Sequence, residues 1–237
     1  FFFFFFLFAA SIGVGLGTNY SSIKANKEYV SETMRGGHSE LSKPTDEQNK
    51  TKGLDLDYAT SWSYGIGETM TLMIPNFMGG SSNYTVSENS DIYKTLVHNG
   101  VPRKSASDFC HAVPTYWGDQ PFTSGPVYVG AIIVFLFIFG LLIVKGPYKW
   151  ALLISTIFSI LLAWGKNFMP FTEFFFNYFP FYNKFRAVSS ILIVAEITMP
   201  LLGFLALRDL MDGNVDKKKA KKMLYISAGI TAGICLI

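Results

Sequence analysis

Long runs of apolar residues that carry no charge constrain this chain more than any other feature of its sequence. The run at 127–144 is wholly uncharged, and the run at 187–207 contains one acid, Glu196. A helix that crosses the hydrocarbon core of a bilayer needs about 20 consecutive apolar residues, with a range of about 17–25. Both runs therefore predict membrane-spanning helices, because helices buried in a water-soluble protein seldom stay uncharged for so long.

Three further runs are shorter or reach an end of the chain. The run at 148–165 is uncharged apart from Lys149, whose long side chain can reach the membrane interface. The runs at 1–17 and 223–237 carry no charge. The predicted fold class is therefore an all-α polytopic membrane protein with about five transmembrane helices. We expect the first and last helices to be truncated, as in an internal piece of a longer protein.

Composition agrees with a membrane protein and excludes several other classes. Half of the residues are apolar, mean hydropathy is +0.30, and 16% are charged, against roughly 25% in soluble domains. This composition excludes a disordered chain, collagen and a disulfide-stapled secreted module. The net charge of +3 is too small to indicate a nucleic-acid partner. Cys110 and Cys235 are expected at different membrane depths and therefore not bonded to each other.

The distribution of lysine and arginine predicts which side each loop faces. Lys145 and Lys149 flank the turn between the second and third spans, and the loop at 208–222 holds six basic residues. Cytoplasmic loops of membrane proteins carry an excess of basic residues. Both loops are therefore expected in the cytoplasm, which places the segments 18–126 and 166–186 on the extracytoplasmic side.

The long outer segment 18–126 is expected to be a mixed, partly helical loop region of roughly 110 residues. Apolar residues at helical spacing predict an amphipathic helix over 20–34. Residues 90–99 predict a short helix with Ser90 as its N-cap. The stretch 39–52 is polar and shows no periodicity, which predicts a surface loop.

Two aromatic and glycine-rich stretches, 58–82 and 114–126, stand out within this outer segment. The first is too short in its apolar part to span, and suits a re-entrant or interfacial loop on the outer membrane surface. In the second, Tyr116 and Trp117 are expected at the level of the lipid headgroups. Two interpretations stay open: these loops anchor the protein at the interface, or they cap a cavity at the outer leaflet.

The sequence contains no nucleotide-binding, metal-binding or catalytic-triad motif. The glycines of 13–17 lack the strand and helix that flank a dinucleotide site. The three histidines are too scattered to be metal ligands, so no metal or other cofactor is predicted. Glu196 is exceptional because a carboxylate inside an apolar span is costly. It should face the bundle or a wet cavity with a partner, or be protonated.

Lys184 and Arg186 form the second chemically notable feature. They lie at the outer mouth of the fourth predicted span, on the side where basic residues are not expected. Arginine can hold a phosphate with two hydrogen bonds, and lysine can add a point charge. The pair could therefore bind a lipid headgroup or a lipid-linked phosphate. It could equally anchor the helix among ordinary headgroups.

Four stretches, in order along the chain, carry a family resemblance. They are ETMRGGHSEL at 32–41, the aromatic stretch at 58–82, PTYWGDQPFTSGPVYVGAI at 114–132, and the segment 164–202 that begins WGKNFMPFTEFFFNYF. Together they resemble the YfhO-like family of bacterial membrane proteins. The resemblance implies a multi-span fold of the GT-C glycosyltransferase type in the cytoplasmic membrane of a bacterium. It also implies transfer of a sugar from a polyprenyl-phosphate-linked donor to an envelope polymer or lipid acceptor on the extracytoplasmic side.

The resemblance also guides the assignment of site residues. In GT-C enzymes the catalytic carboxylate usually lies in the first outer loop, upstream of these residues, so no catalytic base is assigned. The departing lipid phosphate needs cationic groups, which Lys184 and Arg186 supply. Further candidates for a cavity or acceptor site are Trp62, Glu68, Asn76, Trp117, Asp119 and Glu196.

Two other functions remain as alternatives to sugar transfer. A transporter or flippase for a lipid-linked or polar solute would need paired charges and broken helices inside the membrane, and the sequence offers Glu196 and Pro200 in that style. A non-catalytic assembly subunit would only anchor the outer segment. In every case membrane lipids are expected partners and nucleic acid is not.

Overall fold

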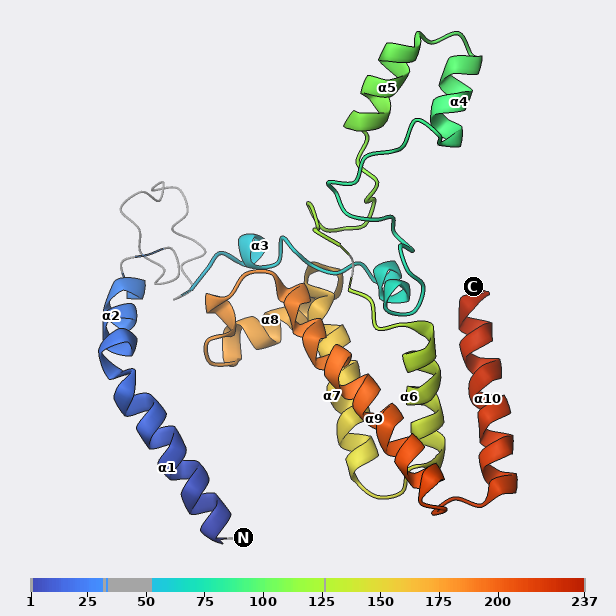
Figure 1. Cartoon of the computed structure of the whole chain (residues 1–237). Helices are drawn as coiled ribbons and strands as arrows, with labels where there is room; N and C mark the ends of the chain where they lie inside the picture. The colour runs from blue at the N-terminus through green and yellow to red at the C-terminus, as the bar shows by residue number, and fades with distance from the viewer. Residues whose placement is uncertain (1, 32, 34–52, 126, 237) are drawn as a thin grey trace. The chain divides into compact units, whose positions relative to one another are not determined.

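The computed structural model describes residues 2–31, 33, 53–125 and 127–236 (Figure 1). Over these ranges the chain forms helices joined by turns and irregular loops, without a strand. The all-α prediction is therefore confirmed for the described part of the chain. The chain groups into two compact units. Unit 1 comprises Phe1–Ala59 with Glu173–Arg186, and unit 2 comprises Thr60–Thr172 with Ala187–Ile237.

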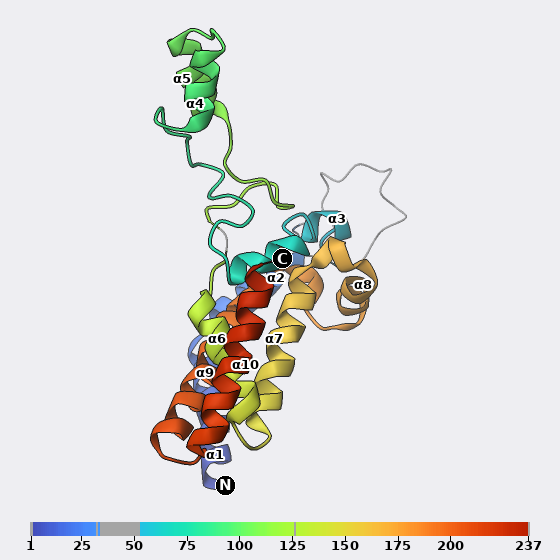
Figure 2. The same cartoon turned by 90° about the vertical axis from the view of Figure 1, so that its right-hand side faces the viewer.

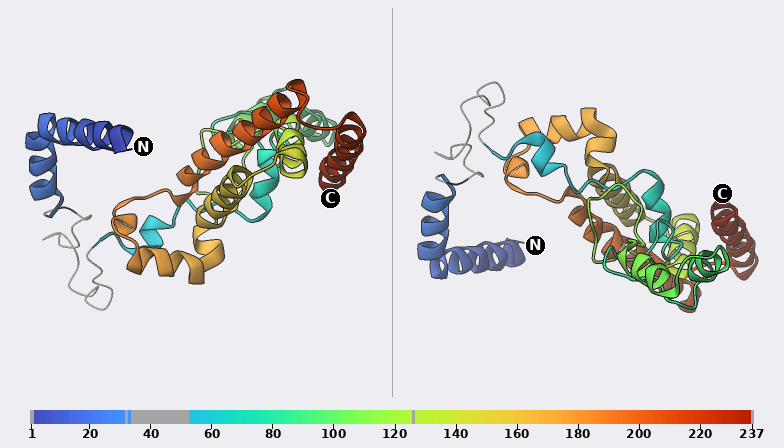
Figure 3. Two further views of the ribbon diagram at one scale, coloured as in Figure 1. Left: turned by 90° about the horizontal axis from the view of Figure 1, so that it is seen from below. Right: turned by 90° about the horizontal axis from the view of Figure 1, so that it is seen from above.

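Four helices form the bundle of unit 2: α6 (Ala131–Ile143), α7 (Tyr148–Ala163), α9 (Ile193–Met211) and α10 (Lys217–Cys235). In this bundle α6 packs between α9 and α10, and α7 packs on α9 (Figure 1 and Figure 2). The views along the bundle show the same order (Figure 3). The turn between α6 and α7 and the turn between α9 and α10 lie at the same end of the bundle.

The tightest contact of the bundle, between α6 and α9, depends on two glycines. A Cβ atom on Gly140 would stand 2.8 Å from the backbone oxygen of Leu202. A Cβ atom on Gly203 would stand 2.9 Å from the Cβ atom of Leu136. Small residues at such crossings let two helix backbones approach closely, which is the usual way helices associate in lipid.

One continuous helical stretch among the described residues is long and apolar enough to cross a membrane. It covers Val188–Met211 and joins η6 (Val188–Leu192) to α9. The helix α7 and the following stretch Gly165–Tyr178 pass the same criterion together, but they are bent by 109°. Two other apolar helices, Phe5–Thr18 and Ala131–Ile143, are shorter. The arrangement of about five membrane spans therefore stays a prediction.

Two bundle helices begin at places other than those the apolar runs indicate. The predicted span at 127–144 becomes helical only at Ala131, because Gly130 has a φ of 107° and breaks the helix there. The helix α10 begins well before the apolar run at 223–237. Its start is fixed by Asp216, whose Oδ2 accepts a hydrogen bond of 3.1 Å from the Lys219 backbone N–H.

The outer segment of unit 2 contains a helical hairpin of α4 (Asp91–His98) and α5 (Arg103–Ala112). The predicted helix over 90–99 is confirmed, and the Ser90 hydroxyl accepts a hydrogen bond of 3.2 Å from the Tyr93 backbone N–H. The helix α5 is not predicted from the sequence, because its polar residues mask the small buried face of Ala106 and Cys110. The predicted loop at 39–52 lies outside the described residues.

Unit 1 consists mainly of short helices. They are α1 (Phe2–Thr18), α2 (Tyr20–Ser31), α3 (Leu56–Ala59), η5 (Tyr182–Lys184) and the second half of α8 (Met169–Tyr178). The helix α2 confirms most of the amphipathic helix expected over 20–34. No helix was predicted within 166–186, where Pro170 and Pro180 interrupt the aromatic residues.

Candidate functional site

Three loop segments that are far apart in the sequence meet in unit 2. They are residues 63–69, which lead into η3 (Gly67–Leu72), residues 116–120, and residues 164–167 at η4 (Gly165–Phe168). Hydrogen bonds between their side chains and backbones join them. We name the group formed by Gly65, Glu68, Tyr116, Asp119 and Asn167 the Glu68 cluster.

Glu68 is the buried centre of this cluster, with 1% of its surface exposed. Its Oε2 accepts a hydrogen bond of 2.6 Å from the Gly65 backbone N–H, and its Oε1 accepts one of 2.5 Å from the Tyr116 hydroxyl. A carboxylate taken out of water needs such donors, because an unpaired buried charge is strongly destabilising. Glu68 therefore holds the loops together and is too deeply buried to touch a ligand.

Tyr116 links Glu68 to the second loop. Its hydroxyl donates to Glu68 and accepts a hydrogen bond of 3.0 Å from the Gln120 backbone N–H. Burial, followed by the hydrogen bond to Glu68, raises the pKa of Tyr116 well above its ordinary value. Tyr116 therefore remains a protonated donor at neutral pH. Tyr116 is buried among the loops, and its position at the level of the lipid headgroups stays a prediction.

Asp119 is the exposed carboxylate of the cluster. Its Oδ2 accepts a hydrogen bond of 3.1 Å from the Asn167 side-chain amide, which also donates to the Tyr64 backbone oxygen at 3.0 Å. The Lys166 ammonium group donates to the Asp119 backbone oxygen at 3.3 Å. Asp119 is thus held in a fixed orientation while its carboxylate stays accessible to a ligand.

Two glycines allow the acidic side chains to approach each other. A Cβ atom on Gly65 would stand 2.8 Å from Asp119 Oδ2 and 3.1 Å from Glu68 Oε2. A Cβ atom on Gly118 would collide with Glu68 Oε1 and with the Tyr116 hydroxyl. Because both positions lack side chains, one buried and one exposed carboxylate can flank the same short stretch of backbone.

Aromatic side chains surround the acidic centre. The Trp62 indole N–H donates to the Phe122 backbone oxygen at 3.2 Å, and the two rings meet edge to face with centroids 5.1 Å apart. The Trp164 indole N–H donates to the Thr69 hydroxyl at 3.0 Å. In contrast, Trp117 is 79% exposed, directly before Gly118 and Asp119. An open aromatic ring therefore lies next in sequence to the accessible carboxylate.

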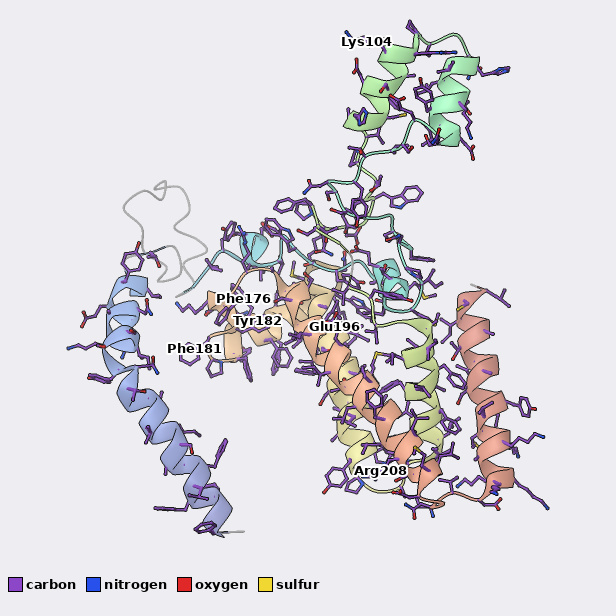
Figure 4. All side chains as sticks on the ribbon, viewed as in Figure 1. Lys104, Phe176, Phe181, Tyr182, Glu196 and Arg208 are labelled. Carbon is purple, nitrogen blue, oxygen red and sulfur yellow. The ribbon has the colours of Figure 1, made fainter. Side chains whose placement is uncertain are left out.

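Three of the residues selected from the sequence belong to these joined loops: Glu68, Trp117 and Asp119. Trp62 lies directly before the first loop and bonds to Phe122, just beyond the second. Asn76 lies in a turn with a φ of 56°, and its backbone oxygen accepts a hydrogen bond of 2.8 Å from the Gly79 N–H. Glu196 is exposed on the first turn of α9, and its side chain makes no hydrogen bond to another described residue (Figure 4).

Lys184 and Arg186 belong to unit 1. Arg186 stacks on Tyr58, with its guanidinium carbon 5.2 Å from the ring centroid, and its Nη1 donates to the Tyr58 hydroxyl at 2.8 Å. Lys184 is the last residue of η5, and Arg186 lies two residues further along the chain. Their surroundings are therefore a basic and aromatic site of their own, within unit 1.

Sequence reasoning missed two partners that give the cluster its geometry. Asn167 orients Asp119, and Tyr116 orients Glu68, yet neither was selected as a site residue. The repeated pattern of a tryptophan and a glycine followed by a polar residue, WGD at 117–119 and WGK at 164–166, was an available signal. Both patterns lie at the joined loops.

No family model, curated protein or solved structure matches this chain. In the ranges that the structure describes, no three histidine, cysteine, aspartate or glutamate side chains gather in a way that could hold a metal ion. The resemblance to the YfhO-like family therefore stays a prediction based on the sequence. The Glu68 cluster itself is the most specific pointer to chemistry in unit 2.

Proposed function

We propose that this chain is part of a membrane glycosyltransferase that acts on the extracytoplasmic side of a bacterial cytoplasmic membrane. The donor is a sugar linked to a polyprenyl phosphate, and the acceptor is an envelope polymer or lipid. The Glu68 cluster binds hydroxyl groups of the sugar or acceptor. The observation that carries this proposal is the accessible carboxylate of Asp119, which Asn167 holds and which follows the exposed Trp117 by two residues.

This combination suits a carbohydrate better than other small ligands. A carboxylate accepts hydrogen bonds from sugar hydroxyls, and a neighbouring amide can fix its orientation. An exposed indole presents a broad apolar face with little conformational entropy to lose, on which the C–H face of a sugar ring can stack. A carboxylate near an acceptor hydroxyl is also the group that inverting sugar transfer requires. The catalytic base is not assigned to any of these residues.

The topology of unit 2 supports the proposed side of action. The turns between α6 and α7 and between α9 and α10 lie at one end of the bundle (Figure 1), where Lys145, Lys149 and the lysines in the first turns of α10 flank them. The second loop of the Glu68 cluster precedes α6 and the third directly follows α7, so both lie at the other ends of these helices. If the basic turns face the cytoplasm, as the excess of lysine suggests, the Glu68 cluster faces outward.

The transporter alternative receives less support from the same residues. It calls for paired charges and broken helices inside the membrane. The bend of 109° between α7 and Gly165–Tyr178 suits the second requirement, so the charges decide. Among the described residues Glu196 makes no ion pair, and it is exposed on α9. A single carboxylate does not provide the charge pair that this alternative needs, so sugar transfer is the function that we carry forward.

The test is to replace Asp119 with Asn in the protein in its native membrane and to measure glycosylation of the envelope. The substitution keeps the size of the side chain and one oxygen that can accept the hydrogen bond from Asn167. It removes the negative charge and replaces the other oxygen with an amide donor. We expect transfer to fall at least about tenfold, since a hydrogen bond to a charged group contributes about 1.5–3 kcal/mol.

The matched control is Asp108→Asn, which removes an exposed carboxylate from α5 outside the cluster. This control should leave transfer unchanged. Normal transfer by Asp119→Asn at a normal level of the protein would contradict a role for the Glu68 cluster in binding the sugar or acceptor.

A further inference from the structure

Unit 1 contains a pair of packed segments, residues 53–59 and 173–186, that has no part in the Glu68 cluster. Residues 53–59 pack against residues 173–186, and the Leu54 backbone N–H donates to the Asn183 backbone oxygen at 2.8 Å. Leu54, Ala59 and Phe176 form a small buried core, on which Tyr182 packs. The two segments are therefore held together by their own core and by a backbone hydrogen bond.

The backbone around η5 adopts conformations that side chains disfavour. Phe181 has a φ of 66° and Ala187 has a φ of 64°, so left-handed residues stand at both ends of the segment 182–186. Such conformations are uncommon for residues other than glycine, and they cluster at ligand-binding loops. The strain keeps the segment in a defined bend, with Arg186 at its end.

Arg186 is seated on an aromatic ring. Its guanidinium group stacks over Tyr58 and donates a hydrogen bond of 2.8 Å to the Tyr58 hydroxyl. This contact orients the planar group, and a guanidinium group has five N–H donors in a fixed fork. A pre-oriented arginine of this kind matches the oxygen atoms of a phosphate group better than a flexible lysine does.

A cavity of about 540 Å³ opens beside Arg186. Arg186 is its charged lining residue, and the remaining lining is aromatic, aliphatic or neutral polar: Asn26, Tyr29, Val30, Thr33, Leu54 and Tyr58. A cavity with one cationic group and a largely apolar wall fits an amphipathic anion. A small hydrated anion would leave the apolar wall in contact with water.

The segment 173–186 is rich in exposed aromatic rings. Five large aromatic side chains between 174 and 185 are more than half exposed: Phe174, Tyr178, Phe179, Phe181 and Phe185. Figure 4 shows Phe181 at the edge of the segment 173–186, whereas Phe176 is buried in the core that this segment shares with residues 53–59. Exposed aromatic patches of this kind mark contact with a partner surface, and aromatic rings are enriched at the boundary of lipid and water.

We infer that the cavity beside Tyr58 and Arg186 binds the phosphate head of an anionic lipid, whose chain lies against the aromatic surface of residues 174–185. The charge that selects the phosphate is that of Arg186, with Lys184 close in sequence. Among the described residues of unit 1, Asp55 and Asp57 on the facing segment and Glu28 on α2 are acids near the cavity lining in sequence. Asp55 is engaged in capping α3, since its Oδ1 accepts a hydrogen bond of 3.0 Å from the Tyr58 backbone N–H.

This inference deepens the proposed function, because a lipid phosphate is also the part of the donor that leaves after sugar transfer. The binding experiment itself does not depend on sugar transfer. The purified chain in detergent micelles is titrated with short-chain phosphatidic acid, with a polyprenyl monophosphate, with short-chain phosphatidylcholine and with inorganic phosphate. We expect the first two to bind and the last two to bind at least about tenfold more weakly.

The variants locate the binding site. Arg186→Ala should weaken binding of both lipid phosphates at least about tenfold, because one charge-assisted pair of hydrogen bonds is lost. Arg186→Lys keeps the charge but loses the forked N–H donors and the stacking on Tyr58. Its affinity should therefore lie between that of Arg186→Ala and that of the unchanged chain. Arg103→Ala on α5 removes an exposed arginine from unit 2 and should bind like the unchanged chain.

Equal binding of phosphatidic acid by Arg186→Ala and the unchanged chain would overturn the inference. If Arg186→Ala does not fold, the comparison rests on Arg186→Lys and on Tyr58→Phe, which keeps the ring and removes the hydroxyl. Binding that depends on Arg186 without any sugar transfer by the protein would leave the inference standing and remove the proposed function. Tighter binding of polyprenyl monophosphate than of phosphatidic acid would identify the polyprenyl lipid as the physiological source, and equal binding would identify bulk anionic lipid.

Discussion

At the scale of single residues, the candidate site illustrates what a sequence shows and what it hides. Glu68 and Asp119 could be selected because an acid is conspicuous in an aromatic stretch. Their opposite roles could not be predicted, because these depend on which loops fold over them. Glu68 is buried by the second loop through Tyr116, whereas Asp119 stays exposed and is oriented from the third loop by Asn167.

The first prediction at this scale concerns Tyr116. Tyr116→Phe keeps the ring but leaves Glu68 Oε1 without its donor, which should destabilise unit 2 by about 1–3 kcal/mol. The pKa of Tyr116 is raised in the folded protein, so its hydroxyl favours folding below the ordinary tyrosine pKa of 10.0. Above that pH the unfolded chain ionises first, and the stability advantage over Tyr116→Phe should shrink.

Unfolding of both proteins in urea at neutral pH and above pH 10, followed by tryptophan fluorescence, measures this difference. Tyr84→Phe is the control, because Tyr84 is 62% exposed and should show neither the loss of stability nor its dependence on pH. A difference between Tyr116→Phe and the unchanged protein that stays constant, or grows, above pH 10 would contradict the proposed role of Tyr116.

At the scale of elements, helix type was easier to predict than helix boundaries. The short helix at 90–99 was found because Ser90 is a strong N-cap before an apolar face. The helix α5 was missed because Ala106 and Cys110 alone form its buried side. The run at 127–144 gave the correct helix but the wrong start, since the effect of Gly130 on the backbone depends on the hydrogen bonds of Val129 and Gly130 to Leu72.

The close approach of α6 and α9 gives a prediction at the same scale. Gly140→Ala places a Cβ atom against the backbone oxygen of Leu202, which cannot move aside as a flexible side chain would. Overpacking of this kind should cost about 1–3 kcal/mol. Gly229→Ala on α10 is the matched control, because a Cβ atom there meets nothing within 4 Å.

Thermal unfolding of the two variants and of the unchanged protein in the same detergent measures the effect of each substitution on stability. Gly140→Ala should unfold at a lower temperature than the unchanged protein. Gly229→Ala should unfold at the same or a higher temperature, because alanine stabilises an exposed helix relative to glycine. Equal unfolding temperatures for all three proteins would show that α6 and α9 do not pack as described.

At the scale of the whole molecule, the proposed function depends on which side of a membrane the loops of unit 2 face. The bundle separates a basic end, where lysines flank the turns at 144–147 and 212–216, from the end that carries the Glu68 cluster (Figure 1). A sugar linked to a polyprenyl phosphate on the outer leaflet can reach the cluster only if the basic end is cytoplasmic. Accessibility from outside the cell therefore tests the arrangement as a whole.

The measurement uses single cysteines in a protein whose Cys110 and Cys235 are replaced by alanine. In intact cells a maleimide that does not cross membranes should label Trp117→Cys, since Trp117 is 79% exposed beside the Glu68 cluster. It should label Lys219→Cys, in the exposed first turn of α10, only after the cells are permeabilised. Labelling in the reverse order would place the Glu68 cluster in the cytoplasm, where it could not meet a donor on the outer leaflet, whereas labelling of both sites in intact cells would show that the bundle does not separate them by a membrane.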